Sequence, residues 1–199
     1  DTKSSALTSL ASADGAVATD VVAIVDTSVT TTKKIAVNAL AQAGIVIATE
    51  QASTSGTSID FTGIPAGVKR ITVMFKGVSL DGTSDYLIQL GDAGGFEATG
   101  YLGACASSGS TTTGTNYTTG FGIISNGSAN ITHGAITLNL EDASDFTWVA
   151  SGVMSISNAA FAQMTSGSKS LSAELTQVRI TTVNGSDNFD AGVINISYT

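Results

Sequence analysis

Strict alternation of apolar and polar residues in one short segment constrains this fold more than any other feature. Between Arg70 and Lys76, the residues Ile71, Val73 and Phe75 fall on one face, and Arg70, Thr72 and Lys76 fall on the other. A period of two is the period of a β-strand with one buried face. The sequence therefore predicts a strand here, with its apolar face in a core.

Turn dipeptides predict hairpins between such strands. Asp81–Gly82 separates this strand from an apolar run at 86–90, and Asn126–Gly127 and Asn184–Gly185 are two further turn signals. Dipeptides of this kind favour type I′ turns, in which both central residues have positive φ. We therefore expect a hairpin at each of these positions, the last one joining the strand before it to the final strand.

Further strands are predicted along the chain, and together they indicate the fold class. Similar apolar patterns occupy residues 135–140, 146–156, 175–183 and 189–196. Charged residues make up only 12% of the chain, so it is too apolar to be disordered. Several strands separated by turn signals indicate an all-β fold, an antiparallel β-sandwich of jelly-roll-like type.

Three regions of the chain differ in amino-acid composition. Residues 1–44 alternate short apolar segments with polar connections, and they hold too few apolar residues for an independent core. Residues 45–57 become rich in Ser, Thr and Gly, which predicts a linker. We therefore expect a short N-terminal connector at 1–44, a linker at 45–57 and the β-sandwich at 58–199, with a homotrimer completing the weak core of the connector.

Several segments resemble a known protein family. The chain resembles the C-terminal β-sandwich module of bacteriophage tail-fibre and other virion-appendage proteins, and the DVVAIVD and TTKKIAVNAL segments resemble a connector of phage fibre shafts. The segments that carry the resemblance to the module are the FTGIP turn at 61–65, the VKRITVMF strand at 68–75, the GTSDYLIQLGD segment at 82–92, the pair Gly100–Tyr101 and the last strand at 189–196.

The resemblance implies a structural virion protein on the tail or capsid surface, and not an enzyme. It implies a trimeric tail fibre or fibre tip subunit that takes part in host surface recognition. Its partners would be its own copies, other virion proteins through residues 1–44, and a host surface glycan or protein. Two alternatives stay open, which are a capsid decoration or head-fibre protein and a glycan-degrading spike domain.

Charge and hydropathy argue against other partners. The formal net charge is −8 and the eight basic residues do not cluster, whereas binding to nucleic acid needs grouped Lys and Arg. No run approaches the roughly 18 apolar residues that a membrane-spanning helix requires. We therefore expect neither nucleic-acid binding nor membrane insertion, and the first residues do not resemble a secretion signal.

Residues suited to catalysis or metal binding are few. His133 is the only histidine and Cys105 the only cysteine, and we expect an ordinary hydrogen-bonded histidine and a buried thiol. A zinc site would need further nitrogen or sulfur ligands. Acidic turns offer oxygen ligands for calcium, but the EF-hand spacing is missing. We expect no catalytic residue, no metal and no cofactor.

A Ser/Thr/Gly-rich run at 107–114 interrupts the predicted sandwich. A long loop in a compact domain is often functional, so we expect a variable surface loop that carries recognition. Tyr101 and Tyr117 are expected to be exposed beside it and able to stack on a sugar, while Phe75 and Trp148 are expected in the core. The predicted receptor-binding residues are Tyr101, Ser107, Ser108, Thr112, Asn116 and Tyr117.

Overall fold

The chain divides into two units, residues 1–45 and 46–199. The computed structural model describes the backbone of residues 21–26 and 31–36, and all of residues 44–199. In the first unit, β1 (Val21–Asp26) and β2 (Thr31–Ala36) pair as an antiparallel ribbon. Residues 1–20, 27–30 and 37–43 of the connector expected at 1–44 lie outside the described residues. Attachment through this connector stays a prediction.

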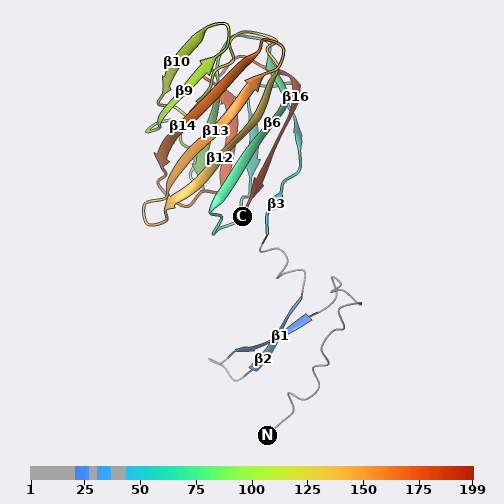
Figure 1. Cartoon of the computed structure of the whole chain (residues 1–199). Coiled ribbons are helices and arrows are strands. Elements are labelled where there is room, and N and C mark those ends of the chain that lie inside the picture. The colour runs from blue at the N-terminus through green and yellow to red at the C-terminus, as the bar shows by residue number, and fades with distance from the viewer. Residues whose placement is uncertain (1–20, 27–30, 37–43) are drawn as a thin grey trace. The chain divides into compact units, whose positions relative to one another are not determined.

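The second unit consists of two antiparallel sheets that pack face to face (Figure 1), which confirms the predicted all-β sandwich. The nine-stranded sheet has the order β10 (Thr112–Tyr117), β9 (Leu102–Ser108), β14 (Phe161–Ser170), β13 (Thr147–Ile156), β12 (Thr132–Asp142), β6 (Arg70–Leu80), β16 (Phe189–Tyr198) and β3 (Val46–Ile47), with β4 (Gln51–Ala52) also beside β16. The five-stranded sheet has the order β11 (Phe121–Ile123), β7 (Tyr86–Asp92), β15 (Gln177–Thr182) and β5 (Ile59–Thr62), with β8 (Gly95–Phe96) beside β7.

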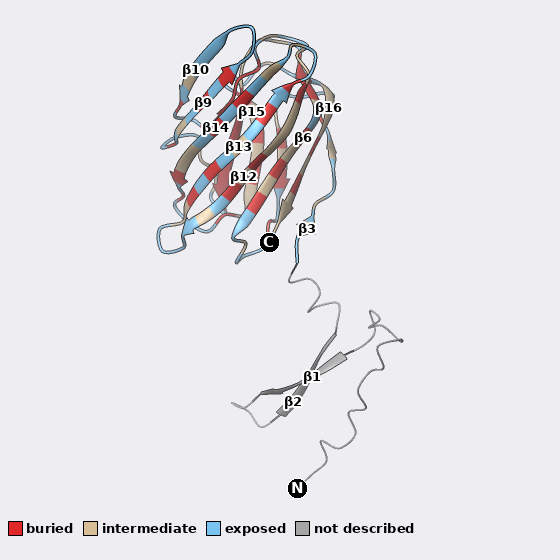
Figure 2. Ribbon diagram, viewed as in Figure 1, coloured by how far each residue is buried: buried red, intermediate tan, exposed pale blue. Residues whose placement is uncertain are grey.

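Alternating burial along the strands places the core between the two sheets. On β6, the apolar side chains of Ile71, Val73 and Phe75 are buried, which confirms the predicted strand face. Trp148 is buried on β13 as expected, and Figure 2 shows buried and exposed residues alternating along β13. The aromatic ring of Tyr86 lies edge-on to Phe75, with ring centroids 5.8 Å apart. The core is thus filled from both sheets.

The three predicted hairpins are wrong, because each turn connects strands of different sheets. Asp81–Gly82 links β6 to β7, Asn126–Gly127 links β11 to β12, and Asn184–Gly185 links β15 to β16. Asn126 does have a positive φ of 58° and Gly185 one of 65°. Asp81, Gly82 and Asn184 do not have a positive φ, so the dipeptides predicted the backbone angles only in part, and they did not decide whether the flanking strands pair.

Two of these connections, β6–β7 and β15–β16, are joined by hydrogen bonds. The backbone N–H of Asn188 donates to Asp81 Oδ1 at 2.8 Å, and the Asn188 side chain donates to Asp81 Oδ2 at 2.9 Å. Asp187 Oδ2 accepts from the backbone N–H of Ser84 at 2.8 Å, and a Cβ at Gly82 would overlap the Asp187 carboxylate. Glycine at this position therefore permits the close approach of the two connections.

The long loop predicted at 107–114 is also wrong, because the segment forms a hairpin. Ser108 pairs with Thr112, so only residues 109–111 lie between β9 and β10. The sandwich interior beneath β9 and β14 is polar, which removes the apolar alternation that would have marked these strands. Thr165 Oγ1 donates to the carbonyl oxygen of Gly122 at 2.8 Å, and Gln163 Nε2 donates to the carbonyl oxygen of Ile124. These side chains of one sheet thereby satisfy a carbonyl of β11 in the other sheet and the carbonyl of the residue that follows β11.

Residues 45–57, expected as a linker, contribute the short strands β3 and β4, both paired with β16. Ser53 follows β4 and is buried, with its backbone N–H donating to Gly192 O at 3.0 Å and its hydroxyl donating to Ala191 O at 2.8 Å. Part of this polar segment is thus held against the edge of the nine-stranded sheet.

Candidate functional site

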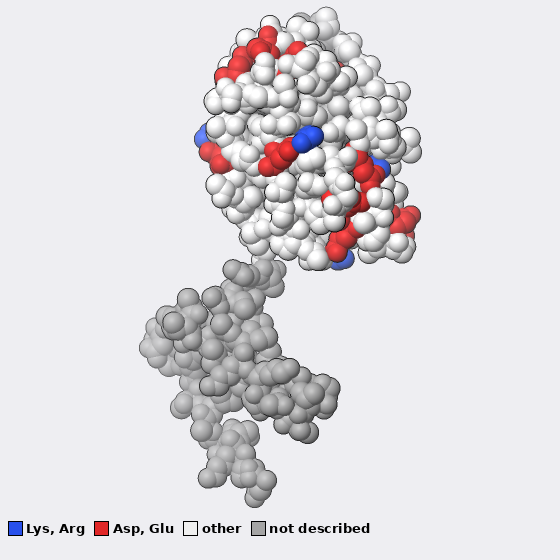
Figure 3. All heavy atoms as spheres, turned by 180° about the vertical axis from the view of Figure 1, so that it is seen from behind, with Lys and Arg blue, Asp and Glu red and all other residues white. Residues whose placement is uncertain are grey.

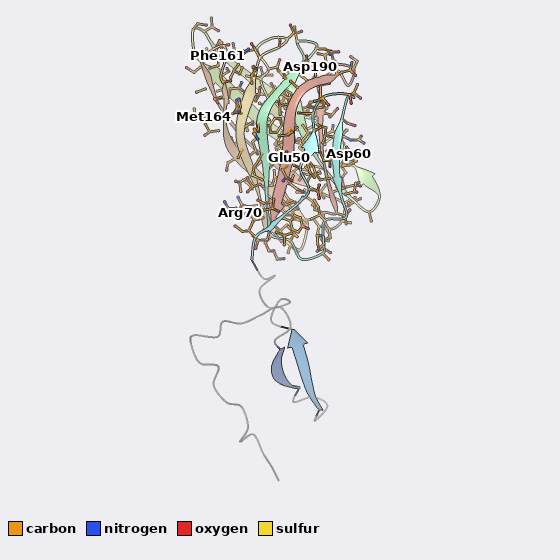
Figure 4. The ribbon with its side chains drawn as sticks, turned by 90° about the vertical axis from the view of Figure 1, so that its right-hand side faces the viewer. Glu50, Asp60, Arg70, Phe161, Met164 and Asp190 are labelled. Atoms are coloured by element: carbon orange, nitrogen blue, oxygen red, sulfur yellow. The ribbon has the colours of Figure 1, made fainter. Side chains whose placement is uncertain are left out.

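Exposed apolar side chains gather on the outer face of the nine-stranded sheet. Leu102, Val149, Val153 and Met164 are exposed by 74%, 38%, 63% and 66%. Val153 pairs with Met164 across β13 and β14, and Met164 pairs with Ala106 across β14 and β9. In Figure 4, Met164 points away from the sandwich on the side opposite Asp60, a residue of the five-stranded sheet.

Two rows of paired residues cross this face without a charged side chain. Residues paired in antiparallel strands point to the same side, so each row follows from the register. We define as the outer face these two rows together with the next row of outward residues, Leu102, Ser168 and Val149. One row contains Asn116, Ala104, Ser166, Ser151, Thr137, Thr72, Ser197 and Ile47, and the other contains Gly114, Ala106, Met164, Val153, Ala135, Met74 and Asn195.

Charge is nearly missing from the strands at this end of the sheet. β9, β10 and β13 contain no Asp, Glu, Lys or Arg, and the only such residue of β14 is Lys169, which is buried. The cations nearest to the rows are Arg70 and Lys76, both exposed on β6. Figure 3 shows the opposite side of the sandwich, where Asp and Glu form several groups. The outer face is therefore the uncharged side of an acidic protein.

A groove with a volume of about 420 Å³ opens where β10, β9 and β14 meet. Its walls include Leu102, Ala104, Asn116 and Ser166, which all point outward. Gly103 and Gly167 pair with each other in this region. The groove is thus a hollow in the outer face, lined by small, uncharged and apolar groups.

Three of the six predicted receptor-binding residues lie on this outward side. Ser108, Thr112 and Asn116 are exposed, and the β9–β10 register places them on the same side as Ala104 and Ala106. The other three predicted residues are Tyr101, Ser107 and Tyr117, and their expected exposure is wrong, since they are 1%, 0% and 5% exposed.

Tyr101 is held in the interior by its hydroxyl group. The hydroxyl accepts a hydrogen bond from the backbone N–H of Leu90 at 2.7 Å and donates one to the carbonyl oxygen of Glu97 at 3.0 Å. Its ring meets that of Phe121 edge-on, with centroids 5.1 Å apart. Burial raises the pKa of this hydroxyl. Tyr101 therefore stabilises the fold and offers no platform for a sugar.

Ser107 and Tyr117 are interior residues of the β9–β10 hairpin. Ser107 Oγ accepts from the Asn126 side-chain amide at 2.7 Å, and the Tyr117 hydroxyl donates to Asp85 Oδ2 at 2.6 Å. Burial, followed by the bond to Asp85, raises the pKa of the Tyr117 hydroxyl. Cys105 is buried in the same cluster as Tyr117, as expected, and burial raises the pKa of its thiol.

The titratable groups of the second unit have structural roles. Lys169 forms a buried ion pair with Glu97, and Arg179 forms two hydrogen bonds to Asp60 at 2.8 and 2.7 Å. His133 is half-buried and accepts from the backbone N–H of Gly77 at 3.2 Å. Within the described residues, no three His, Cys, Asp or Glu side chains are grouped so that they could hold a metal ion. The same part of the chain contains no helix with the length and apolarity needed to cross a membrane.

One sequence signal could have revealed the outer face. β13 carries apolar residues at both parities, with Trp148 and Met154 inward and Val149 and Val153 outward. A strand in a two-layer sandwich needs apolar residues on its inner face only. Apolar residues on both faces of one strand therefore predict an apolar patch on the outward side of the sheet.

Comparison with known proteins found no matching family model, no matching curated protein and no matching solved structure.

Proposed function

We propose that this chain is a structural, non-catalytic subunit of a bacteriophage virion appendage, a tail fibre or fibre tip, and that it acts by protein–protein contact. The observation that supports contact is the outer face, on which Leu102, Val153 and Met164 expose apolar surface beside uncharged small residues. Contiguous exposed apolar patches mark interaction sites on soluble proteins. The virion context comes from the resemblance of the 61–101 and 189–196 segments to the fibre module.

Host recognition is the second part of the proposal. Ser108, Thr112 and Asn116 remain the candidates, because they are exposed on the hairpin that borders the groove. The buried Tyr101 and Tyr117 no longer support stacking on a sugar, so hydrogen bonding by hydroxyl and amide groups replaces it. The copies are expected to form a homotrimer, with residues 1–44 attached to other virion proteins.

Electron microscopy of labelled particles tests the virion assignment. Gold-labelled antibody against the chain is expected to bind purified virions at the tail or fibre tips. Labelling of the capsid surface would favour the decoration or head-fibre alternative, and particles free of label would reject the proposal. Release of reducing ends from host polysaccharide by the purified chain would instead favour the glycan-degrading alternative.

A further inference from the structure

We propose that a second copy of this chain covers the outer face, so that subunits assemble through the two uncharged rows. The inference rests on the proposed function, because it names the partner of the same surface. Asn116 lies in one of the two rows, so this contact leaves Ser108 and Thr112, of the three hairpin candidates, for host recognition. Contact between the same face of two copies pairs them about a two-fold axis, so it is separate from the homotrimer that is expected through residues 1–44. Three properties of the rows support it, which are their extent, their charge and the distribution of side-chain sizes.

The rows are large enough for a specific interface. Neighbouring strands lie about 4.8 Å apart and residues rise about 3.3 Å along each strand, so the outer face presents roughly 480 Å² as a flat area over five strands, β10, β9, β14, β13 and β12, and about six residues along each. Protruding side chains such as Leu102 and Met164 increase the accessible area beyond this value. Two such faces together bury about 1,000 Å², which is where specific interfaces begin.

The charge distribution favours another copy of the chain over a charged partner. With a formal net charge of −8, two copies repel each other wherever carboxylates approach. Contact through β9, β10, β13 and β14 avoids this repulsion, because no charged side chain points outward from these strands. A strongly basic or acidic partner could form no ion pair with these strands. An uncharged surface is therefore the best partner for the outer face, and each copy of the chain supplies one.

Side-chain size alternates in a way that suits sheet-on-sheet packing. Met164 and Val153 are neighbours in one row, and the adjacent row places Ser166 and Ser151 two residues away on the same strands. Bulky side chains of one copy can therefore lie over the small side chains of another, as facing sheets do when they interdigitate about 10 Å apart. The 420 Å³ groove offers a further hollow for a protruding apolar side chain.

The methionines provide a test on the unmodified full chain. Of the three methionines, Met164 lies exposed on the outer face while Met154 is 1% exposed in the core. The chain is exposed to short pulses of hydrogen peroxide at a series of protein concentrations. Mass spectrometry measures the oxidation of each methionine, and light scattering measures the mass of the assembly. We expect Met164 to oxidise about tenfold more slowly once the scattering mass rises, because sulfoxide formation needs solvent access. Met154 should remain protected at every concentration.

A matched pair of variants supplies the control. Val153→Arg places a charge in the proposed contact, whereas Val183→Arg changes a valine of similar exposure, 53%, outside the outer face. Val153→Arg is expected to raise the dissociation constant at least about tenfold and to restore fast Met164 oxidation, because an unpaired charge would be buried. Val183→Arg should behave as the unmodified chain. Thermal melting confirms that both variants are folded.

Two results would overturn the inference. One is Met164 oxidation at an unchanged rate while the mass rises, which means that residues 1–44 or another surface hold the copies together. The other is a folded Val153→Arg variant that assembles and protects Met164 as the unmodified chain does. A chain that stays monomeric at every concentration and leaves Met164 reactive would overturn the inference as well. Each of these leaves the virion proposal standing, and unlabelled virions would reject that proposal without affecting the contact.

Discussion

The hydroxyl of Tyr117 donates a hydrogen bond of 2.6 Å to Asp85 Oδ2, while Asp85 Oδ1 accepts one of 2.9 Å from the backbone N–H of Ser125. A single carboxylate thereby ties together β10, the connection before β7 and the segment after β11. This arrangement explains why a tyrosine next to a Ser/Thr/Gly-rich hairpin faces inward. It also changes what a substitution at Tyr117 is expected to do.

Replacing Tyr117 should reduce stability. Tyr117→Phe removes the donor to Asp85, and a hydrogen bond to a charged group contributes about 1.5–3 kcal/mol to the free energy of unfolding. Tyr117→Ala should cost more, about 3–5 kcal/mol, because it also leaves a cavity. Urea denaturation measures both values. Asn116→Ala, an exposed neighbour on β10, serves as the control and should change stability by no more than about 0.5 kcal/mol. Equal effects at the two positions would contradict the burial of Tyr117.

The two faces of β6 should respond differently to a carboxylate. Val73 is 0% exposed in the core, whereas Thr72 points outward in the outer face. Val73→Asp should lower the free energy of unfolding by several kcal/mol, because the buried carboxylate has no partner. Thr72→Asp should change it by about 0.5 kcal/mol or less. Thermal melts on dilute protein separate this effect from any change in assembly, and similar losses for both variants would show that the strand faces are assigned wrongly.

Gly192 should be intolerant of any side chain. Its φ is +91°, and a Cβ would overlap the carbonyl oxygen of Gly77 where β16 bulges against β6. Gly192→Ala should therefore destabilise the sandwich by more than about 1 kcal/mol through backbone strain and crowding. Gly114→Ala is the matched control, because a Cβ there meets nothing within 4 Å. If thermal melting ranks the two variants equally, the bulge does not hold Gly192 in this conformation.

Acid should destabilise the sandwich through the carboxylates of Asp92 and Glu97. The hydroxyl of Ser172 at 2.6 Å and the N–H of Gly94 at 2.7 Å lower the pKa of Asp92. Burial opposes ionisation of Glu97, but hydrogen bonds from Lys169 and Ser172 outweigh it, so its pKa is lowered as well. A carboxyl whose pKa is lower in the folded state stabilises the fold above its unfolded pKa, and this stability is lost as the pH falls through the folded pKa.

The melting temperature should therefore hold steady near neutral pH and fall below about pH 4, where unfolded carboxyl groups begin to take up protons. Ser172→Ala removes the largest cause of the lowered Asp92 pKa and a smaller side-chain contribution to the lowered Glu97 pKa, while it keeps the backbone bond from Ser172 to Glu97. This variant should be less stable at pH 7 and should lose less on acidification. Ser155→Ala, exposed on β13, should follow the unmodified chain. An unchanged acid profile in Ser172→Ala would show that Asp92 does not contribute.

The sequence allowed the sandwich to be predicted where the interior is apolar. Ile71, Val73 and Phe75 alternate clearly because they meet a hydrocarbon core. β14 was missed because its inward side includes Gln163 and Thr165, which bind a carbonyl of β11 and the carbonyl of the residue that follows β11. A polar interior removes the period-two signal although the strand is regular. Pairing between strands depends on long-range contacts, and turn dipeptides report only on local backbone angles.

The candidate site was predicted in part for the same reason. The hairpin residues Ser108, Thr112 and Asn116 are exposed as expected, but the tyrosines beside them turn inward to partners distant in sequence. Asp85 and Leu90 could not be recognised as those partners without the fold. The outer face itself depends on which strands are neighbours, since Met164, Val153 and Ala106 become adjacent only through the sheet register.

Truncation should locate the N-terminal limit of the sandwich. Removal of residues 1–44 leaves β3 paired with β16 and keeps the hydrogen bond of 2.9 Å from the backbone N–H of Ala48 to Ile196 O. Removal of residues 1–57 deletes β3, β4 and the buried Ser53, so the edge of the nine-stranded sheet loses its cover and its bonds to Ala191 and Gly192. The shorter truncation should therefore retain the melting temperature of the sandwich, and the longer one should lower it.

An attachment assay on the truncated chains separates the role of the connector from that of the folded sandwich. If residues 1–44 bind other virion proteins, both truncated chains should fail to join particles in a reconstitution assay, although only the longer truncation is destabilised. The unmodified chain, added to particles that lack it, is the positive control. If a folded chain without residues 1–44 still joins particles, the sandwich itself carries attachment. The outer face is then the available apolar surface for it.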